Sequence, residues 1–570
     1  MRPVVCPVVV GRDEELAVLD GELSRARDGA GGVAFLVGEA GIGKSRLARE
    51  AGARATAAGM VVLRGRAVQG GAPVPFRPLA EALHSGLRDR THDDPALAPY
   101  RPALGQLVAD GAGASHQQAS PLVLLEAVVR LLRSLAGHRG LLLVLEDLHW
   151  ADADTLSVVE YLADNLASEA ALCLGTVRSD EPSSAGTLVD ALAGRRAAAA
   201  IALRRLPPAE VAEMVAACAP EAELTAVGRE VLERRAEGVP FLVEELLSAA
   251  LARDGGPVSE RLERAVPVSY RELVRSRLAR VPAEARRTVQ AAAVLGRGFD
   301  WTLLPEIAGL DPRDVLGALR AAVDAQLVSA GDDETFEFRH ALLRESILAE
   351  LLPPERRELA LRAADVIQAT RPGLPGELCE LAADLRERGG DRDGAFRLLL
   401  EAGRRALARA ALATAEITAE RARSLGEGDP WSEMGADLLL AEILSLAGKV
   451  DRLREVGAEV LETAAQHPFS MGSPARQASV HLRIAQGIAD AGDPEAAEPH
   501  VQRAAALAGA DETAAIRLEA LRARLAMARG DPEGAASSAA RALNAAERAG
   551  LRDAACRALL VLARAALERG

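Results

Sequence analysis

The chain has 570 residues, which is too long for one hydrophobic core and predicts about four domains of roughly 150 residues each. Aromatic residues make up only 2% of it, and its richness in Ala, Leu, Arg and Glu favours helices over sheets. The net charge of −14 argues against a sequence-independent nucleic-acid surface over the whole chain, although a small local one is compatible with it.

The cysteines and the apolar segments indicate where the protein works. The five cysteines lie far apart without a C-x-x-C pair, so the sequence predicts neither a disulfide framework nor a zinc site. The apolar N-terminus is interrupted by Gly11–Glu15 before a signal peptide would be complete. No apolar run approaches the ~20 residues of a membrane span. We therefore predict a cytoplasmic protein without a membrane partner.

The motif that organises the chain is V-A-F-L-V-G-E-A-G-I-G-K-S-R at residues 33–46. A short apolar strand, Val33–Val37, precedes a G-x-x-x-x-G-K-S loop, and good helix formers follow it. In this context glycines let backbone N–H groups cradle phosphate oxygens, Lys44 reaches the β- and γ-phosphates, and the Ser45 hydroxyl can ligate Mg²⁺. The sequence therefore predicts a site for ATP or ADP with Mg²⁺, in preference to an ordinary glycine-rich turn.

A second apolar strand, Leu141–Leu145, ends in Glu146 and Asp147. Such a pair, roughly 100 residues after a phosphate loop, can provide one carboxylate for Mg²⁺ and one that orients or deprotonates the attacking water. The alternative is a solvated acidic turn. Another strand candidate, Met60–Arg64, lies between the two motifs and indicates a parallel α/β sheet of the additional-strand class of P-loop ATPases.

Two more strand candidates follow, at Ala171–Thr176 and Ala200–Leu203. The first leads to Arg178, and parallel sheets place their sites at the carboxyl ends of strands. Arg178 is therefore a candidate to sense or stabilise the γ-phosphate, with an ordinary surface arginine as the equal alternative.

Residues 268–350 have the pattern of a winged-helix unit. We expect three helices and a two-stranded wing, at 268–279, 283–295, 312–324, 327–329 and 335–338. Winged helices can bind DNA, but this one is not conspicuously basic, so we favour an intramolecular role.

From about residue 354 onward the pattern is entirely helical. Gly-Asp turns recur at Gly390, Gly492 and Gly530, and the last two are 38 residues apart, near the tetratricopeptide period of about 34. The repeated helix–G-D-P-E–helix unit favours a solenoid over a plain helical bundle. The last helix, 553–569, lacks the polar face of a capping repeat, so we expect a truncated piece of a longer protein.

Six motifs, in this order, resemble the STAND ATPases, specifically the large ATP-binding LuxR-type transcriptional regulators. They are V-V-G-R-D-E-E-L at 9–16, G-E-A-G-I-G-K-S at 38–45, V-L-E-D-L-H-W-A-D at 144–152, T-V-R-S-D-E at 176–181, G-V-P-F-L-V-E-E-L at 238–246 and F-R-H-A-L-L-R-E at 338–345. The resemblance covers roughly residues 8–365, and the helical remainder is similar to the sensor region of that family.

The resemblance implies roles for the matching residues. Arg178 resembles the sensor arginine, Pro240 the proline that packs against adenine, and His340 the winged-helix histidine that contacts the ADP β-phosphate; a lone histidine after a strand is otherwise usually structural. The predicted nucleotide-binding set is Val10, Gly11, Arg12, Gly38, Gly41, Gly43, Lys44, Ser45, Arg46, Pro240 and His340. The predicted catalytic set is Glu146, Asp147 and Arg178, and the predicted metal ligands are Ser45, Asp147 and Glu146.

Two features depart from the family pattern. The acidic pair begins with Glu146 rather than Asp, so either carboxylate could serve the metal, and we favour Asp147 with Glu146 in support. Nothing after residue 354 resembles the family's LuxR-type helix-turn-helix, so DNA binding belongs to a C-terminal domain that this chain does not contain, or this member lacks it.

The predicted architecture is a P-loop NTPase core at 1–205, a helical lid at 206–265, a winged helix at 266–352 and TPR-like helical repeats at 353–570. The predicted function is an ADP-bound, autoinhibited switch of a LuxR-type regulator. A small-molecule inducer or protein effector at the repeats would release it, ATP would allow self-association, and slow hydrolysis would reset it. Two alternatives remain open: a constitutive remodelling ATPase, and an interaction scaffold in which the nucleotide is structural.

Overall fold

The computed structural model describes residues 6–68, 74–87, 94–108, 121–219, 226–251, 278, 281–325, 327–331, 335–339, 341–466, 474–509 and 511–569. The chain divides into two compact units. The first contains Met1–Val108, Leu122–Leu374 and Asp384–Gly390, and the second contains Ala109–Pro121, Pro375–Ala383 and Asp391–Gly570.

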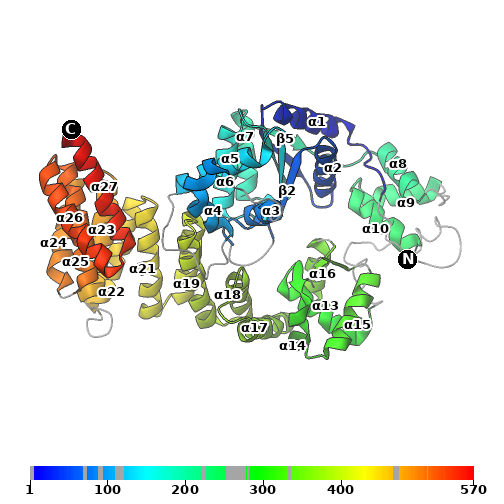
Figure 1. Cartoon of the computed structure of the whole chain (residues 1–570). Coiled ribbons are helices and arrows are strands. Elements are labelled where there is room, and N and C mark those ends of the chain that lie inside the picture. Colours follow the sequence, from blue (N-terminus) through cyan, green and yellow to red (C-terminus); the bar gives the residue numbers. More distant parts are fainter. Residues whose placement is uncertain are drawn as a thin grey trace. The chain divides into compact units, whose positions relative to one another are not determined.

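The first unit contains a five-stranded parallel sheet (Figure 1). Its strands are β1 (Gly32–Gly38), β2 (Val61–Arg66), β3 (Leu141–Glu146), β4 (Ala171–Arg178) and β5 (Ala198–Ala202), in the order β2-β3-β4-β1-β5. β4 lies between the strand of the phosphate loop and the strand of the acidic pair, and this confirms the predicted additional-strand class. All eight residues of β4 are buried, as a parallel sheet covered on both faces requires.

Helices pack around this sheet because their apolar side chains lie on one face. They are α1 (Asp13–Arg27), α2 (Lys44–Ala57), α3 (Arg77–Leu87), α4 (Arg101–Val108), α5 (Pro121–Ala136), α6 (Ala153–Asn165) and α7 (Ser184–Gly194). Leu19 of α1 and Leu47 of α2 enter one cluster with Leu36 of β1 and Val144 of β3. This cluster holds β1 and α2 together, and the phosphate loop joins those two elements.

Three further helices form a separate small core: α8 (Pro208–Cys218), α9 (Ala226–Ala236) and α10 (Pro240–Leu251). Val211, Leu232 and Leu247 meet in it, and the N-terminal residues Cys6 and Val10 pack into the same cluster. Cys6 and Val10 are thereby held against this helical subdomain.

The winged helix contains α13 (Ala283–Leu295), α14 (Leu304–Ala308), α15 (Pro312–Asp324) and α16 (Ala341–Glu350). Its sheet has the antiparallel order β6 (Gly298–Asp300), β8 (Thr335–Phe338), β7 (Val328–Ala330). The two predicted strands are present as β7 and β8. The third strand, β6, was not predicted, because three residues are too few to carry a periodic pattern. The helix predicted at 268–279 lies outside the described residues, apart from Leu278.

The remaining described residues are helical (Figure 1). The first unit holds α17 (Pro353–Thr370), and α18 (Leu378–Gly389) contributes to both units. In the second unit follow α19 (Arg392–Ala408), α20 (Leu412–Gly426), α21 (Pro430–Leu446), α22 (Val450–Gln466), α23 (Pro474–Asp490), α24 (Pro494–Ala508), α25 (Glu512–Ala528), α26 (Pro532–Ala549) and α27 (Arg552–Arg569). None of the helices in the described ranges is long and apolar enough to cross a membrane.

The recurring Gly-Asp signal marks the junctions between these helices. Gly390, Gly492 and Gly530 have φ angles of 76° to 88°, which glycine adopts without steric cost at the end of a helix. The following aspartates each begin the next helix as an N-cap that accepts a backbone N–H, as Asp531 does from Gly534 at 2.9 Å. The repeated turns therefore reflect helix-capping chemistry.

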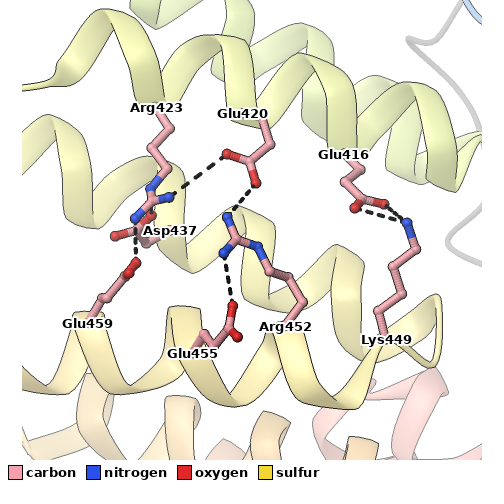
Figure 2. A network of polar contacts seen from close by, with 8 residues as sticks. All are labelled: Glu416, Glu420, Arg423, Asp437, Lys449, Arg452, Glu455 and Glu459. Atoms are coloured by element: carbon pink, nitrogen blue, oxygen red, sulfur yellow. Dashed lines mark hydrogen bonds and ion pairs between the residues drawn. The ribbon is translucent and has the colours of Figure 1, made fainter.

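Charged side chains join three of these helices, α20, α21 and α22 (Figure 2). Arg423 of α20 is ion-paired with Asp437 of α21 at 2.7 Å and with Glu459 of α22. Asp437 is only 5% exposed, and its burial, partly offset by Arg423, raises the pKa of its carboxyl to about 6. The network thus contains one carboxylate that is costly to ionise.

Candidate functional site

The phosphate loop joins β1 to α2, and its lysine folds back over it. The Lys44 Nζ donates hydrogen bonds to the carbonyl oxygens of Gly38 at 2.6 Å and Glu39 at 2.8 Å. Gly41 and Gly43 have φ angles of 77° and 109°, which bend the loop in a way that other residues rarely adopt. Burial, followed by the nearby positive charge of Arg178, lowers the pKa of Lys44 to about 8. The negative charge of an anion at this position would favour the ammonium form and so offset both effects.

One pocket opens from this loop, and its far end is apolar. Val8, Val9 and Val10 from the start of the chain line it together with Leu206, Met214, Pro240 and Phe241. The Phe241 N–H donates to the Gly41 carbonyl oxygen at 3.3 Å, so the start of α10 is attached directly to the phosphate loop. Such a wall suits the flat, mainly apolar face of a nucleobase.

Arg12 fixes the geometry of this apolar end. It is 2% exposed, and its Nη2 donates to the carbonyl oxygens of Arg204 at 2.6 Å and Ile42 at 3.3 Å. It also pairs with Glu15 at 3.2 Å, while burial lowers its pKa. The adjacent Gly11 has a φ angle of 65°, which other residues rarely adopt, and a Cβ there would also displace the Glu210 carboxylate. Arg12 therefore connects the N-terminal segment, the phosphate loop and the chain after β5.

At the other end of the pocket, the two residues of the acidic pair take different positions. Asp147 lines the pocket, its backbone is in the left-handed region at φ 59°, and its N–H donates to the Thr176 hydroxyl at 2.8 Å. Glu146 is not among the lining residues, and its carboxylate pairs with Arg66 at 3.4 Å. This arrangement favours Asp147 as the carboxylate that faces a ligand.

Arg178 also lines this pocket, at the end of β4. Its guanidinium lies over the Trp150 ring, 4.9 Å from the centroid, and pairs with Glu181 at 3.1 Å. Arg178 is 7% exposed, so the interpretation as an ordinary surface arginine does not fit its position.

The structure brings most of the predicted site residues into one pocket. Those that line it are Val10, Arg12, Gly41, Gly43, Lys44, Ser45, Arg46, Asp147, Arg178 and Pro240. Gly11, Gly38 and Glu146 are next to lining residues without lining the pocket, and His340 lies outside the described residues.

Sequence analysis missed several lining residues. Phe241 stands next to Pro240 in the G-V-P-F-L-V motif, so its place beside the pocket could have been inferred from that neighbour. Arg297 comes from the winged helix, about 150 residues from the acidic pair, and its Nη1 lies 3.3 Å from Asp147 Oδ2. The Gly-Arg-Gly sequence around it indicates a tight turn but not a binding role.

The donors in the pocket fit Mg²⁺. Ser45 and Asp147 line the same pocket and offer a hydroxyl and a carboxylate, the hard oxygen ligands that Mg²⁺ prefers. Within the described ranges no group of three or more His, Cys, Asp or Glu side chains could hold a metal ion. A single carboxylate is compatible with Mg²⁺, because this ion keeps waters and takes phosphate oxygens of its nucleotide as ligands.

Comparisons with known proteins agree with this geometry. Residues 8–174 match the AAA ATPase domain family. An uncharacterized protein of Rhizobium meliloti (strain 1021) is 26% identical over 451 residues, which are 73% of this chain but only 42% of that protein. The crystal structure of a Signal Transduction ATPase with Numerous Domains (STAND) protein with a tetratricopeptide repeat sensor from Pyrococcus horikoshii aligns with a TM-score of 0.51 and 16% identity, over 99% of this chain and 75% of that one.

These matches show two features of the chain. The chain contains an AAA ATPase domain, which implies binding of ATP or ADP, and its fold is similar to that of the Pyrococcus horikoshii protein. The narrower assignment to LuxR-type regulators stays a prediction.

Proposed function

We propose that this protein is a nucleotide-operated signalling switch that belongs to a LuxR-type transcriptional regulator. One observation carries the proposal: residues of the phosphate loop, the helical subdomain and the winged helix line a single pocket. A nucleotide in such a pocket contacts all three, so its identity can bias their arrangement. A ligand shifts two states only by its different affinity for each, and contacts to several domains supply such a difference.

We propose that each end of the pocket holds a different part of the nucleotide. The phosphates lie on the loop and receive hydrogen bonds from backbone N–H groups and from Lys44, while the base lies against Met214, Pro240 and Phe241. Ser45 and Asp147 would hold Mg²⁺, which would neutralise negative charge at the phosphates. Glu146 and Asp147 orient the attacking water, and Arg178 stabilises the charge that develops on the γ-phosphate.

The helical repeats are the proposed receiver of the signal. A small-molecule inducer or a protein effector binds there, loosens the ADP state and allows ATP to enter, after which the protein self-associates. Slow hydrolysis restores the ADP state. The neighbouring fold from Pyrococcus horikoshii carries a tetratricopeptide repeat sensor, and this supports the assignment.

The test is the nucleotide that the purified protein contains. Protein is denatured, and the released nucleotide is identified by chromatography and quantified against protein. We expect nearly one ADP per chain in the parent protein and almost none in Lys44→Ala. We also expect a lowered ADP content in His340→Ala, since we propose that this histidine contacts the β-phosphate.

Two outcomes would contradict the switch. Protein without nucleotide that hydrolyses ATP rapidly and unprompted is a working ATPase, such as a remodelling enzyme. Nucleotide that neither exchanges nor changes the self-association of the protein is structural, and the chain is then an interaction scaffold.

A further inference from the structure

The acidic pair carries more charge contacts than nucleotide binding explains. Asp147 Oδ2 lies 3.3 Å from Arg297 Nη1 and 3.4 Å from Arg66 Nε, so one carboxylate oxygen faces two guanidinium groups. Arg66 ends β2 in the ATPase core, whereas Arg297 precedes β6 in the winged helix. The side chains of Asp147 and Arg297 are only 13% and 15% exposed, so water screens this ion pair little.

A second ion pair joins the same two domains beside the first. The Arg66 guanidinium reaches Glu337 of β8 at 3.6 Å and also pairs with Glu146 and Asp147. The core therefore contributes Arg66 and Asp147, and the wing contributes Glu337 and Arg297. Each arginine faces a carboxylate of the other domain. Glu337 is 47% exposed, which makes this the weaker contact of the two.

The two wing residues are held together as one rigid edge. The Arg297 carbonyl oxygen accepts a hydrogen bond from the Phe338 N–H at 2.7 Å, and the next residue, Gly298, pairs with Glu337 in the sheet. Phe299 packs against Phe338, with 5.7 Å between ring centroids. A displacement of the wing therefore removes Arg297 and Glu337 from the core at the same time.

A divalent cation needs the same carboxylate. Mg²⁺ binds carboxylate oxygens at about 2 Å, and a double positive charge at that distance from Asp147 Oδ2 would stand beside both guanidinium groups. Without a metal, Arg297 and Arg66 both supply positive charge to Asp147, and Arg297 is the one that belongs to the wing. The wing and the metal are therefore alternative sources of positive charge for Asp147.

We propose that Arg297 of the winged helix and the divalent cation compete for Asp147, so that docking of the wing and binding of the metal exclude each other. Arg297 thereby positions Asp147 when the wing is docked, and its release frees the carboxylate for the metal. The inference rests on the proposed function only in assigning Asp147 to the cation. It also implies that Arg297, a residue outside the phosphate loop, couples metal binding to the position of the wing.

The first measurement needs no nucleotide. Hydrogen–deuterium exchange of β6 and β8 is compared between the parent protein, Arg297→Gln, Asp147→Asn and the double variant, with Arg320→Gln on the exposed face of α15 as the control. We expect each single variant to exchange about fivefold faster at the wing, because each loses this largely buried ion pair. The double variant should be no faster than either single variant, and Arg320→Gln should match the parent. Unchanged wing exchange in Arg297→Gln overturns the proposal whether or not the protein binds nucleotide.

The second measurement reports the metal directly. Mn²⁺ is titrated into the protein with saturating ADP, and free Mn²⁺ is followed by electron paramagnetic resonance, while binding of fluorescent ADP in EDTA is measured separately. We expect Arg297→Gln to bind Mn²⁺ about five- to tenfold more tightly than the parent and Arg297→Lys to fall between them. Equal Mn²⁺ affinities overturn the competition. Failure to bind ADP in EDTA would instead contradict the proposed function, and the exchange measurement would still decide the inference.

Discussion

The Lys44 ammonium donates to the carbonyl oxygen of Gly38 at 2.6 Å, across the loop that it would serve when a nucleotide is bound. Lys44 is 7% exposed, and its lowered pKa of about 8 leaves a reactive neutral amine at mildly alkaline pH. The sequence contains one other lysine, Lys449, which is 54% exposed and pairs with Glu416 at 2.7 Å. The two lysines provide a direct assay, in which Lys449 is the internal control for Lys44.

We predict that ADP protects Lys44 from acylation. The chain is treated near pH 8 with an N-hydroxysuccinimide ester, and modification of each lysine is quantified by mass spectrometry. Saturating ADP should reduce modification of Lys44 more than about tenfold, because the phosphates cover the amine and favour its protonated form. Lys449 should react equally with and without ADP. Equal protection of both lysines, or of neither, would contradict the placement of the phosphates.

A second prediction concerns Arg12. In Arg12→Ala the carbonyl oxygens of Arg204 and Ile42 lose their buried donor, which should destabilise the ATPase core by about 1–3 kcal/mol. Nucleotide affinity should fall at least about tenfold, since each 1.4 kcal/mol is a factor of ten. Calorimetric titration and thermal melting measure the two effects. Arg25→Ala is the matched control, because that side chain is 60% exposed on the same helix and should change both by little.

A third prediction tests the packing of β2 against α3. A Cβ at Gly65 would lie 1.7 Å from the Pro78 carbonyl oxygen, so Gly65→Ala forces the strand and the helix apart. We expect a loss of about 1–3 kcal/mol in the stability of the ATPase core, measured from the midpoint of its unfolding in urea. Gly32→Ala is the control, because a Cβ at Gly32 meets no atom within 4 Å. The packing would be misplaced if both variants had the midpoint of the parent.

These elements differ in how far the sequence predicts them. The phosphate loop and the strands around it were predicted because their signal is local: an apolar run, a glycine loop and a helix former follow one another. The Gly-Asp junctions were predictable for the same reason, since Asp531 caps the helix that begins beside it. β6 was missed because three residues, Gly298–Asp300, carry no period.

The contacts that join distant segments could not be predicted in this way. The ion pair between Asp147 and Arg297 connects residues 150 positions apart, and nothing in either local sequence specifies the partner. The sequence around Arg66 does not specify its partners either. The fold brings its guanidinium to Glu146 and Glu337. Motifs indicate the chemistry of a site, whereas the ion pairs between its distant segments depend on the tertiary structure.

The fourth prediction follows from the charge network of the repeats. The Asp437 pKa in the folded protein is about 6, above its ordinary value of 3.8, so the fold favours the protonated carboxyl. Its contribution to stability is therefore present below about pH 4 and is lost as the pH rises through 6. Asp437→Asn keeps an acceptor for Arg423 without the charge, and should stabilise α20–α22 at pH 7 by about 1–2 kcal/mol.

The measurement is hydrogen–deuterium exchange of peptides from α21, compared between variant and parent at each pH. The difference should be near zero at pH 4 and greatest at pH 7. Asp451→Asn on α22, where the carboxylate is 98% exposed, is the control and should match the parent at both pH values. A variant that exchanges faster than the parent at pH 7 would show that the Asp437 carboxylate stabilises the network as an anion.

The sheet order also determines when the phosphate loop can form during synthesis. β1 pairs with β4 on one side and β5 on the other, so the strand that ends at Gly38 has no partner until the ribosome has added the 140 residues up to Arg178. At 5–20 residues per second this takes about 7–28 s. During that time the apolar segment Val33–Val37 is without its neighbouring strands β4 and β5. Chaperones or other unfolded chains can then bind it. Codons that slow translation between β1 and β4 would lengthen this exposure, and the yield of native protein would fall without any change in its amino-acid sequence.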